Sequence, residues 1–194
     1  MSSDSDRQER HTRRRFVGGF ALYCVSGTAL AHAVAPAAEK FHADLTAPER
    51  SLSFLHTHTG ERLRADYFQG GQYQPECLTQ VNYLLRDFRT GDVHAIDPAL
   101  LDTLFALQVL AERRAVFEVI SGYRSPATNA MLRRTTEGVA QHSMHLEGRA
   151  IDVRLDQVPT RGLARLARSL QRGGVGFYPV SNFVHVDTGP VRSW

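Results

Sequence analysis

The stretch SMHLEGRAID at residues 143–152 leads from a polar loop into a short buried strand, and it decides how the C-terminal half of the chain folds. Gly148 permits a tight turn into that strand. Because side chains alternate along a strand, Asp152 faces away from the apolar residues on either side of it. The stretch FVHVD at residues 183–187 repeats this alternation and places His185 opposite its own apolar face.

The segments around these two strands predict one α+β domain from residue 49 to residue 194. Alternating apolar residues between Leu52 and Tyr67, interrupted by a turn at Gly60, predict an N-terminal hairpin. Helices in blocks and strands in hairpins favour a small, mostly antiparallel sheet flanked by helices over a doubly wound fold. The expected elements are strands at 115–120, 150–155, 175–178 and 183–187 and helices at 75–88, 98–113, 127–134 and 160–172.

The sequence suggests a metal-binding site formed by His145, Asp152 and His185. Two imidazoles and one carboxylate are ligands that Zn²⁺ takes readily, and three protein ligands with one open position characterise catalytic zinc. The competing interpretation is that these are ordinary polar residues at strand ends. His142 lies three residues before His145 and offers an alternative metal pair, although its polar neighbours favour a role facing substrate or solvent.

Two further residues are candidates for catalysis. Asp187 lies two positions after His185 on the same strand face, where it can take a proton from water at the metal's open position. Alternatively, Asp187 accepts backbone hydrogen bonds or orients His185. Arg124 follows a strand in the turn SGYRS (121–125), where it can hold a substrate carboxylate or stabilise an oxyanion, or else form a structural ion pair.

The first 33 residues predict an export signal. A polar start leads into Arg13–Arg15, then into an apolar stretch at 16–30 and a small-x-small site at Ala31–Ala33. This pattern resembles a twin-arginine signal. The apolar stretch is shorter than the ~20 residues that cross a membrane, so we expect cleavage after Ala33 and no membrane span in the mature protein. An uncleaved anchor is the alternative. We expect a linker at 34–48 and a periplasmic location.

Composition excludes several classes of protein. The chain has 194 residues, 42% of them hydrophobic, with 23 basic and 20 acidic residues. Five arginines and three acids precede residue 34, which leaves 18 basic and 17 acidic residues and no basic run that would suggest a nucleic-acid partner. The glycines at 173–176 lie between a helix and a strand, which is the wrong context for a phosphate-binding loop. Without the leader, Cys77 is the only cysteine and no internal disulfide is possible.

The combined motifs resemble one family of zinc peptidases. They are S-x-H-x-x-G-x-A-x-D at 143–152, SGYRS at 121–125, GGVGFY at 173–178, FVHVDTGP at 183–190 and the terminal Trp194. Together they are similar to the murein endopeptidase K-like (YcbK-like) proteins, which belong with D-Ala-D-Ala carboxypeptidases, lysostaphin and the hedgehog domain. The resemblance covers most of the chain after the leader.

This resemblance implies Zn²⁺ held by His145, Asp152 and His185, Arg124 as the substrate or transition-state arginine, and hydrolysis of peptide cross-links in peptidoglycan. The sequence departs from the related enzymes where they carry their base. Asn182 replaces the glutamate of the carboxypeptidases and Phe183 replaces the histidine of lysostaphin-like enzymes. The general-base role therefore passes to Asp187 by elimination.

The sequence thus predicts an exported zinc-dependent murein endopeptidase that acts on peptidoglycan cross-link peptides. Three alternatives stay open at this point. A D,D- or L,D-carboxypeptidase on stem peptides would use the same metal site with a closed pocket. A non-catalytic peptidoglycan-binding module would keep the zinc without the base, and a metal-free structural domain would need every histidine to have an ordinary structural role.

Overall fold

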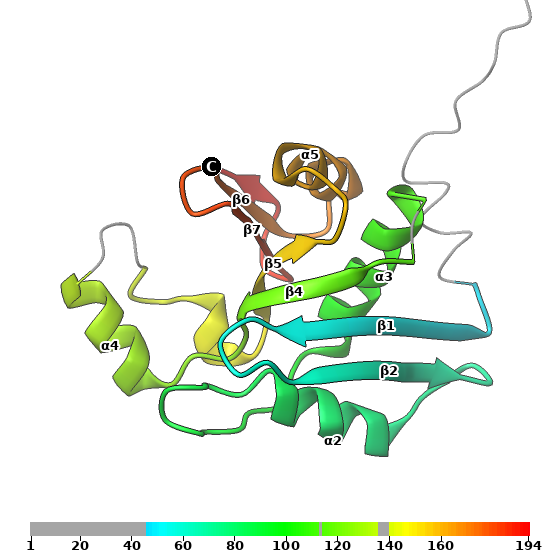
Figure 1. Cartoon of the computed structure of the whole chain (residues 1–194), viewed down its shortest axis with the longest axis horizontal. Coiled ribbons are helices and arrows are strands. Elements are labelled where there is room, and N and C mark those ends of the chain that lie inside the picture. Colours follow the sequence, from blue (N-terminus) through cyan, green and yellow to red (C-terminus); the bar gives the residue numbers. More distant parts are fainter. Residues whose placement is uncertain (1–45, 113, 136–139) are drawn as a thin grey trace, which may run out of the picture. The chain divides into compact units, whose positions relative to one another are not determined.

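One twisted sheet organises the protein (Figure 1). The computed structural model describes residues 46–112, 114–135 and 140–194, so the predicted signal at 1–33 and most of the linker at 34–48 lie outside the described residues. Within those residues the sheet has eight strands in the order β3-β2-β1-β4-β5-β7-β6-β8. The strands are β1 (Glu49–His56), β2 (Arg62–Gln69), β3 (Gln72–Tyr73), β4 (Val116–Ser121), β5 (Ala150–Leu155), β6 (Gly174–Tyr178), β7 (Phe183–Asp187) and β8 (Arg192–Ser193).

Most neighbouring strands run antiparallel, which confirms the predicted α+β class. The exceptions are the β1–β4 and β6–β8 pairs, which are parallel. The predicted hairpin of β1 and β2 is present, and the β1–β4 pairing makes it part of the main sheet. In the centre, β5 pairs with β7 so that Asp152 lies directly opposite His185.

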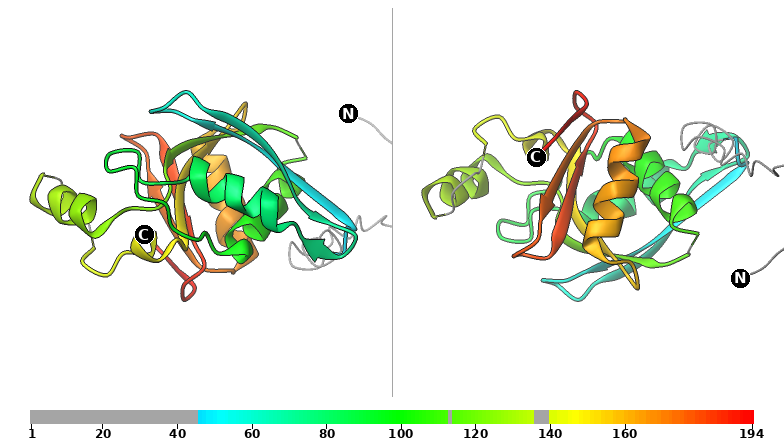
Figure 2. Two further views of the ribbon diagram at one scale, coloured as in Figure 1. Left: turned by 90° about the horizontal axis from the view of Figure 1, so that it is seen from below. Right: turned by 90° about the horizontal axis from the view of Figure 1, so that it is seen from above.

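In the described part of the chain, four α-helices and one short 3₁₀-helix accompany the sheet: α2 (Pro75–Leu84), α3 (Pro98–Leu110), α4 (Pro126–Thr135), η1 (Met144–Glu147) and α5 (Thr160–Leu170). Proline at the first position pre-sets the backbone of α2 and α3, and Asp97 caps α3 by accepting from the backbone N–H of Ala99. In both views of Figure 2, α3 and α5 lie side by side against the sheet. The α4 helix projects at one end of the domain (Figure 1).

The core lies between one sheet face and the helices. Ile151, Val153 and Leu155 of β5 are almost fully buried there, together with Val184 and Val186 of β7. Most of the remaining members come from β1, β2, β4, α2, α3 and α5, with Val175 of β6 and the loop residues Leu85 and Ile96, and they form one continuous apolar cluster with them. Alternation therefore directs the polar residues of β5 and β7 to the opposite sheet face, away from this core.

The first helix ends earlier than its apolar periodicity predicts. The α2 helix stops at Leu84, four residues before Phe88. The reason is local, because Asp87 bonds the backbone N–H of Arg89 through its side chain and that of Gly91 through its carbonyl. An aspartate that satisfies nearby backbone groups competes with continued helix.

The described residues include no helix long and apolar enough to cross a membrane.

Candidate metal centre

Three side chains converge on the sheet face that is opposite the core. Asp152 and His185 are directly paired across β5 and β7, and His145 enters from η1, the short turn that precedes β5. Gly148 ends η1 in the left-handed region at φ 66°, and a Cβ there would collide with the carbonyl oxygen of Ala95. Glycine is therefore required to turn the chain from His145 into β5.

The donor atoms of this triad are spaced as a tetrahedral metal requires. His145 Nε2 lies 3.2 Å from His185 Nδ1 and 3.3 Å from Asp152 Oδ1, and His185 Nδ1 lies 2.9 Å from the same oxygen. Ligands about 2.0–2.1 Å from zinc at tetrahedral angles are roughly 3.3 Å apart. The lone pairs of three donor atoms at these distances repel one another unless a cation or a proton lies between them. The His145, Asp152 and His185 side chains thus form a buried metal-binding triad.

A hydrogen bond to the far ring nitrogen of each histidine directs its inner nitrogen into the triad. His145 Nδ1 donates to the carbonyl oxygen of Gly122 at 2.7 Å, so its Nε2 lone pair points into the triad. His185 Nε2 donates to Asp187 Oδ2 at 3.0 Å, which leaves Nδ1 as the donor atom. Hydrogen bonds from the far ring nitrogen fix ligand orientation and raise ligand basicity at metal sites.

Asp187 is fully buried and lies behind His185, not on the open side of the triad. Its Oδ1 accepts from the backbone N–H groups of Gly174 and Gly189, at 2.9 and 2.8 Å, and Arg192 pairs with Oδ2 at 2.6 Å. Because the two nitrogens of an imidazole point in diverging directions, a carboxylate on Nε2 does not reach a ligand bound at Nδ1. These contacts differ from the general-base position expected for Asp187 and match its alternative, a residue that orients His185.

The charges of the triad depend on one another. Burial opposes protonation of His185, but hydrogen bonds to Asp152 and Asp187 outweigh it and raise the pKa of His185 to about 9. Burial lowers the pKa of His145, with Asp152 acting in the opposite direction. Burial also acts to raise the pKa of Asp152, yet the two histidines hold this pKa far below its ordinary value. The carboxylate is therefore ionised and the centre favours cations.

Arg124 lies beside the triad and forms an ion pair with one of its members. Its Nη2 group contacts Asp152 Oδ2 at 3.2 Å and Ser121 Oγ at 3.3 Å, and its backbone N–H donates to the carbonyl of His145. The side chain is 12% exposed, and its Nε is buried without a hydrogen-bond partner in the described structure. Arg124 therefore holds the outer oxygen of Asp152 and has donor capacity left for a ligand.

The triad lies in a cavity of about 580 Å³. One wall is aromatic, because Tyr178 stacks on Phe183 with ring centres 4.6 Å apart and Trp194 lies 5.3 Å from the His185 ring. The indole N–H of Trp194 donates to the Tyr178 hydroxyl at 2.8 Å. The exposed His142 also lines the cavity. An extended ligand therefore meets apolar rings on one side of the metal centre.

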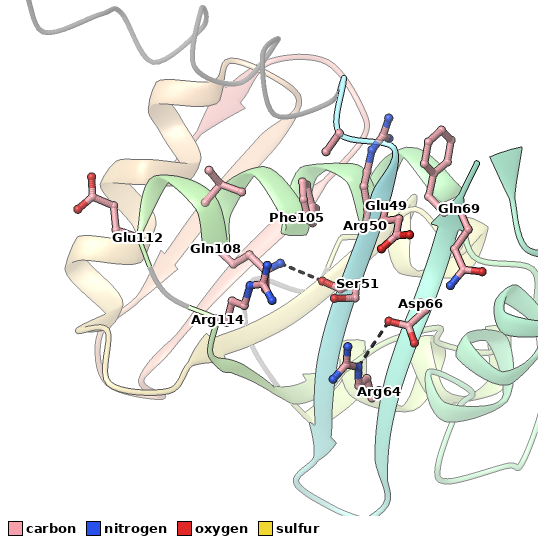
Figure 3. Close-up of a pocket in the computed structure, with 13 residues that line it drawn as sticks. Glu49, Arg50, Ser51, Arg64, Asp66, Gln69, Phe105, Gln108, Glu112 and Arg114 are labelled. Carbon is pink, nitrogen blue, oxygen red and sulfur yellow. Dashed lines mark hydrogen bonds and ion pairs between the residues drawn. The ribbon is translucent and has the colours of Figure 1, made fainter. Parts of the chain in front are cut away.

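A second cavity, of about 440 Å³, lies between β1, β2 and α3 (Figure 3). It contains no member of the triad, and charged groups in and beside it pair with one another. Arg64 lies 3.5 Å from Asp66, and the buried Arg50 lies 2.7 Å from Asp102. Its chemistry is that of a structural polar cluster, so the triad cavity is the candidate functional site.

A buried His-Asp-His centre at the edge of an open cavity, on a mixed α+β sheet, has the donor set and the open side of a catalytic metal site. Comparison with known proteins then identifies the family. The family profile of peptidoglycan L,D-endopeptidase MepK matches residues 44–194. The chain belongs to this family, which confirms the resemblance predicted from its motifs.

Curated relatives agree with the profile. The probable peptidoglycan L,D-endopeptidase MepK of Haemophilus influenzae is 48% identical over 150 residues, which cover 77% of this chain and 81% of that protein. The peptidoglycan L,D-endopeptidase MepK of Escherichia coli K12 is 41% identical over 174 residues, covering 89% of this chain and 94% of that protein, and the Shigella flexneri protein gives the same values.

Sequence reasoning missed several residues around the site. Arg192 pairs with Asp187, and Arg89 lines the cavity from the loop after α2. The sequence offered one usable signal, the glycine at position 176, and it concerns the aromatic wall of the cavity. A Cβ there would lie 2.7 Å from the indole of Trp194, so this glycine provides the space for the indole beside His185. The last residue of β1, His56, is fully buried, and its ring packs edge-on against Phe88.

Proposed function

We propose that this protein is an exported, zinc-dependent endopeptidase that hydrolyses peptide cross-links in peptidoglycan, at the L,D bonds named for its relatives. One observation carries the proposal. In a chain of this family, His145, Asp152 and His185 direct three donor atoms to one point in an open cavity of about 580 Å³. Catalytic metal centres keep such an open side, whereas structural zinc sites are closed by a fourth protein ligand.

The metal would be held by the inner nitrogens of His145 and His185 and by Asp152 Oδ1. When bound, it supplies Lewis-acid activation of the scissile carbonyl and of the attacking water. The nitrogen and carboxylate donor set and its near-tetrahedral spacing suit zinc. The protein itself provides a rigid frame, because β5, β7 and η1 fix the three side chains before any substrate arrives.

Arg124 is proposed to stabilise the negative charge that develops on the carbonyl oxygen as the peptide bond is attacked. Its contact with Asp152 orients the guanidinium beside the metal position, and its partly satisfied donors leave N–H groups for an oxyanion. The aromatic wall of Tyr178, Phe183 and Trp194 would hold the peptide along the cavity and exclude water from one side of it.

The proton that water loses needs an acceptor on the open side of the triad. We propose His142 for this role, because it lines the cavity and is exposed, whereas Asp187 is enclosed behind His185. As the water oxygen bonds to the carbonyl carbon, His142 takes the proton and returns it to the leaving amine when the C–N bond breaks. His142→Ala then lowers kcat by roughly 100-fold or more with zinc retained, whereas His58→Ala, in the same cavity, keeps kcat.

Asp187 is proposed to act as a positioning residue. Its carboxylate holds the Nε2–H of His185 and is itself held by two backbone N–H groups and Arg192. This arrangement keeps the Nδ1 lone pair of His185 directed at the metal, as partners on the far ring nitrogen do in other metal sites.

The function is tested with purified, cross-linked peptidoglycan and the zinc-loaded protein. Mass spectrometry of the muropeptides is expected to show loss of cross-linked dimers and gain of monomers. A matched His185→Ala protein, which lacks one ligand, should leave the dimers intact. Release of single amino acids would instead show a carboxypeptidase, and unchanged muropeptides would show a binding module.

Export by the twin-arginine pathway is a separate proposal. It rests on the sequence of residues 1–33, which carries paired arginines, a short apolar stretch and a small-x-small site. The protein recovered from the periplasm is expected to begin at Val34, and an Arg13→Lys, Arg14→Lys variant should stay in the cytoplasm as the full-length chain. Periplasmic recovery of that variant at the normal level would contradict the twin-arginine route.

A further inference from the structure

The cavity around the triad carries more positive than negative side chains. Arg89, Arg124 and Arg192 all line it, and Asp152 is the one carboxylate among the lining residues in the described part of the chain. Arg124 is paired with Asp152, and Arg192 with Asp187. Arg89 is exposed and forms no ion pair with any residue that the structure describes. One cation at this site therefore lacks a counter-charge from the described protein.

The Arg89 side chain rests on an aromatic platform. Its guanidinium lies over the ring of Phe88, 4.2 Å from the ring centre. Phe88 is fixed by two histidines of the β1–β2 hairpin, because His58 stacks on it at 4.2 Å and the buried His56 contacts its edge at 5.5 Å. A guanidinium stacked on a held ring loses less freedom when it binds a ligand.

The backbone of Arg89 is tied to the loop that carries Arg124. The buried Asp87 accepts from the backbone N–H of Arg89 at 2.9 Å through Oδ1 and from that of Ser125 at 2.8 Å through Oδ2. Ser125 directly follows Arg124. One carboxylate therefore fixes the two arginine-bearing loops relative to each other, and its own oxygens are occupied by backbone groups.

We propose that Arg89 is a specificity-determining residue that binds a free carboxylate of the substrate beside the scissile peptide bond. The inference rests on the proposed function and specifies the substrate as an anionic cross-linked peptide. A planar guanidinium matches a carboxylate with two parallel hydrogen bonds. Arg124 forms an ion pair with Asp152 and remains beside the reacting carbonyl. Arg89 holds the substrate further along the cavity.

The test uses two synthetic cross-linked peptides that differ only in a carboxylate or a carboxamide beside the scissile bond. A second pair carries a non-hydrolysable methylene-amine link at that bond and is used for calorimetric binding. The zinc-loaded proteins are wild type, Arg89→Ala, Arg89→Lys and Arg86→Ala. Arg86 is the matched control, because it also lies over an aromatic ring, that of Tyr83, but does not line the cavity.

Wild type is expected to bind the carboxylate peptide roughly 10- to 100-fold more tightly than the carboxamide, as charge-assisted hydrogen bonds allow. Arg89→Ala should lose most of this preference through KM, with kcat on the carboxamide peptide unchanged. Arg89→Lys should restore part of it, and Arg86→Ala should keep it whole.

Equal binding of the two peptides by wild type, or a preference that survives in Arg89→Ala, would overturn the inference. The same holds if Arg86→Ala loses the preference to the same extent, because the effect would then be one of general charge. If wild type shows the preference in binding but hydrolyses neither cleavable peptide, the carboxylate site stands and the proposed peptidase function fails.

Discussion

Replacing Asp187 with asparagine tests how the protein controls its metal ligand. The side chain keeps its shape, so the question is which way the new amide points. Oδ1 accepts from the N–H groups of Gly174 and Gly189, whereas Oδ2 faces His185 and Arg192. Turning the amide nitrogen toward the two backbone donors would leave both unsatisfied, at about 1–3 kcal/mol each. The amide nitrogen therefore faces His185, and Arg192, whose side chain is 41% exposed, gives up its bond to that position and keeps the oxygen that it contacts at 3.2 Å.

In that orientation the amide donates to His185 Nε2, and the ring proton moves to Nδ1. This is the nitrogen that lies 2.9 Å from Asp152 Oδ1 and supplies the metal ligand. Loss of such a partner typically costs 10- to 100-fold in metal affinity, or about 1.4–2.7 kcal/mol. We expect Asp187→Asn to bind zinc more weakly by this factor in chelator competition, and to recover most of its muropeptide hydrolysis at saturating zinc.

A second buried aspartate provides the control. Asp102 is paired with Arg50 at 2.7 Å and accepts from the hydroxyls of Tyr67 and Tyr73, away from the triad. Asp102→Asn is expected to destabilise the fold and leave the zinc affinity unchanged. A folded Asp187→Asn protein that keeps wild-type zinc affinity would refute the positioning role, and one that keeps its zinc but has lost all turnover would restore the general-base role to Asp187.

Three further substitutions test other parts of the account. Arg124→Lys keeps the charge but loses the planar fork, so kcat should fall by roughly 100-fold with zinc content unchanged; an unchanged kcat would remove Arg124 from the reaction. Gly176→Ala should displace the indole of Trp194, the only tryptophan, and shift its fluorescence to the red, whereas Gly162→Ala, whose Cβ would meet only Val158 at 4.0 Å, should not. Burial lowers the pKa of His56 below 6.5, so the unfolded chain binds more protons than the folded one. The free energy of unfolding of wild type therefore decreases as the pH falls below about 6.5. His56→Leu should make this free energy depend less on pH. Urea unfolding at pH 5 and pH 7.5 measures this, and an identical slope in both proteins would contradict it.

The metal ligands could be predicted because strand alternation acts over only a few residues. It placed Asp152 and His185 on the polar face of their strands, and the resemblance joined them to His145. Which strands pair is a long-range property, so the direct β5–β7 register and the parallel β1–β4 pair came from the structure. Those pairings are set by the packing of the whole sheet.

The catalytic assignments were harder to predict for a different reason. Alternation correctly put Asp187 on the same strand face as His185, but the ring nitrogen that it contacts depends on side-chain torsions and on the backbone groups of Gly174 and Gly189. Arg89 carried no sequence signal at all. It reaches the cavity because Asp87 ends the helix early and ties the following loop to Ser125.

X-ray absorption at the zinc edge of the protein as purified tests the central claim most directly. We expect one zinc ion per chain with only nitrogen and oxygen neighbours at about 2.0–2.1 Å, and loss of that signal in His145→Ala. Absence of bound zinc, or a sulfur neighbour near 2.3 Å, would show that the three converging side chains do not hold the ion.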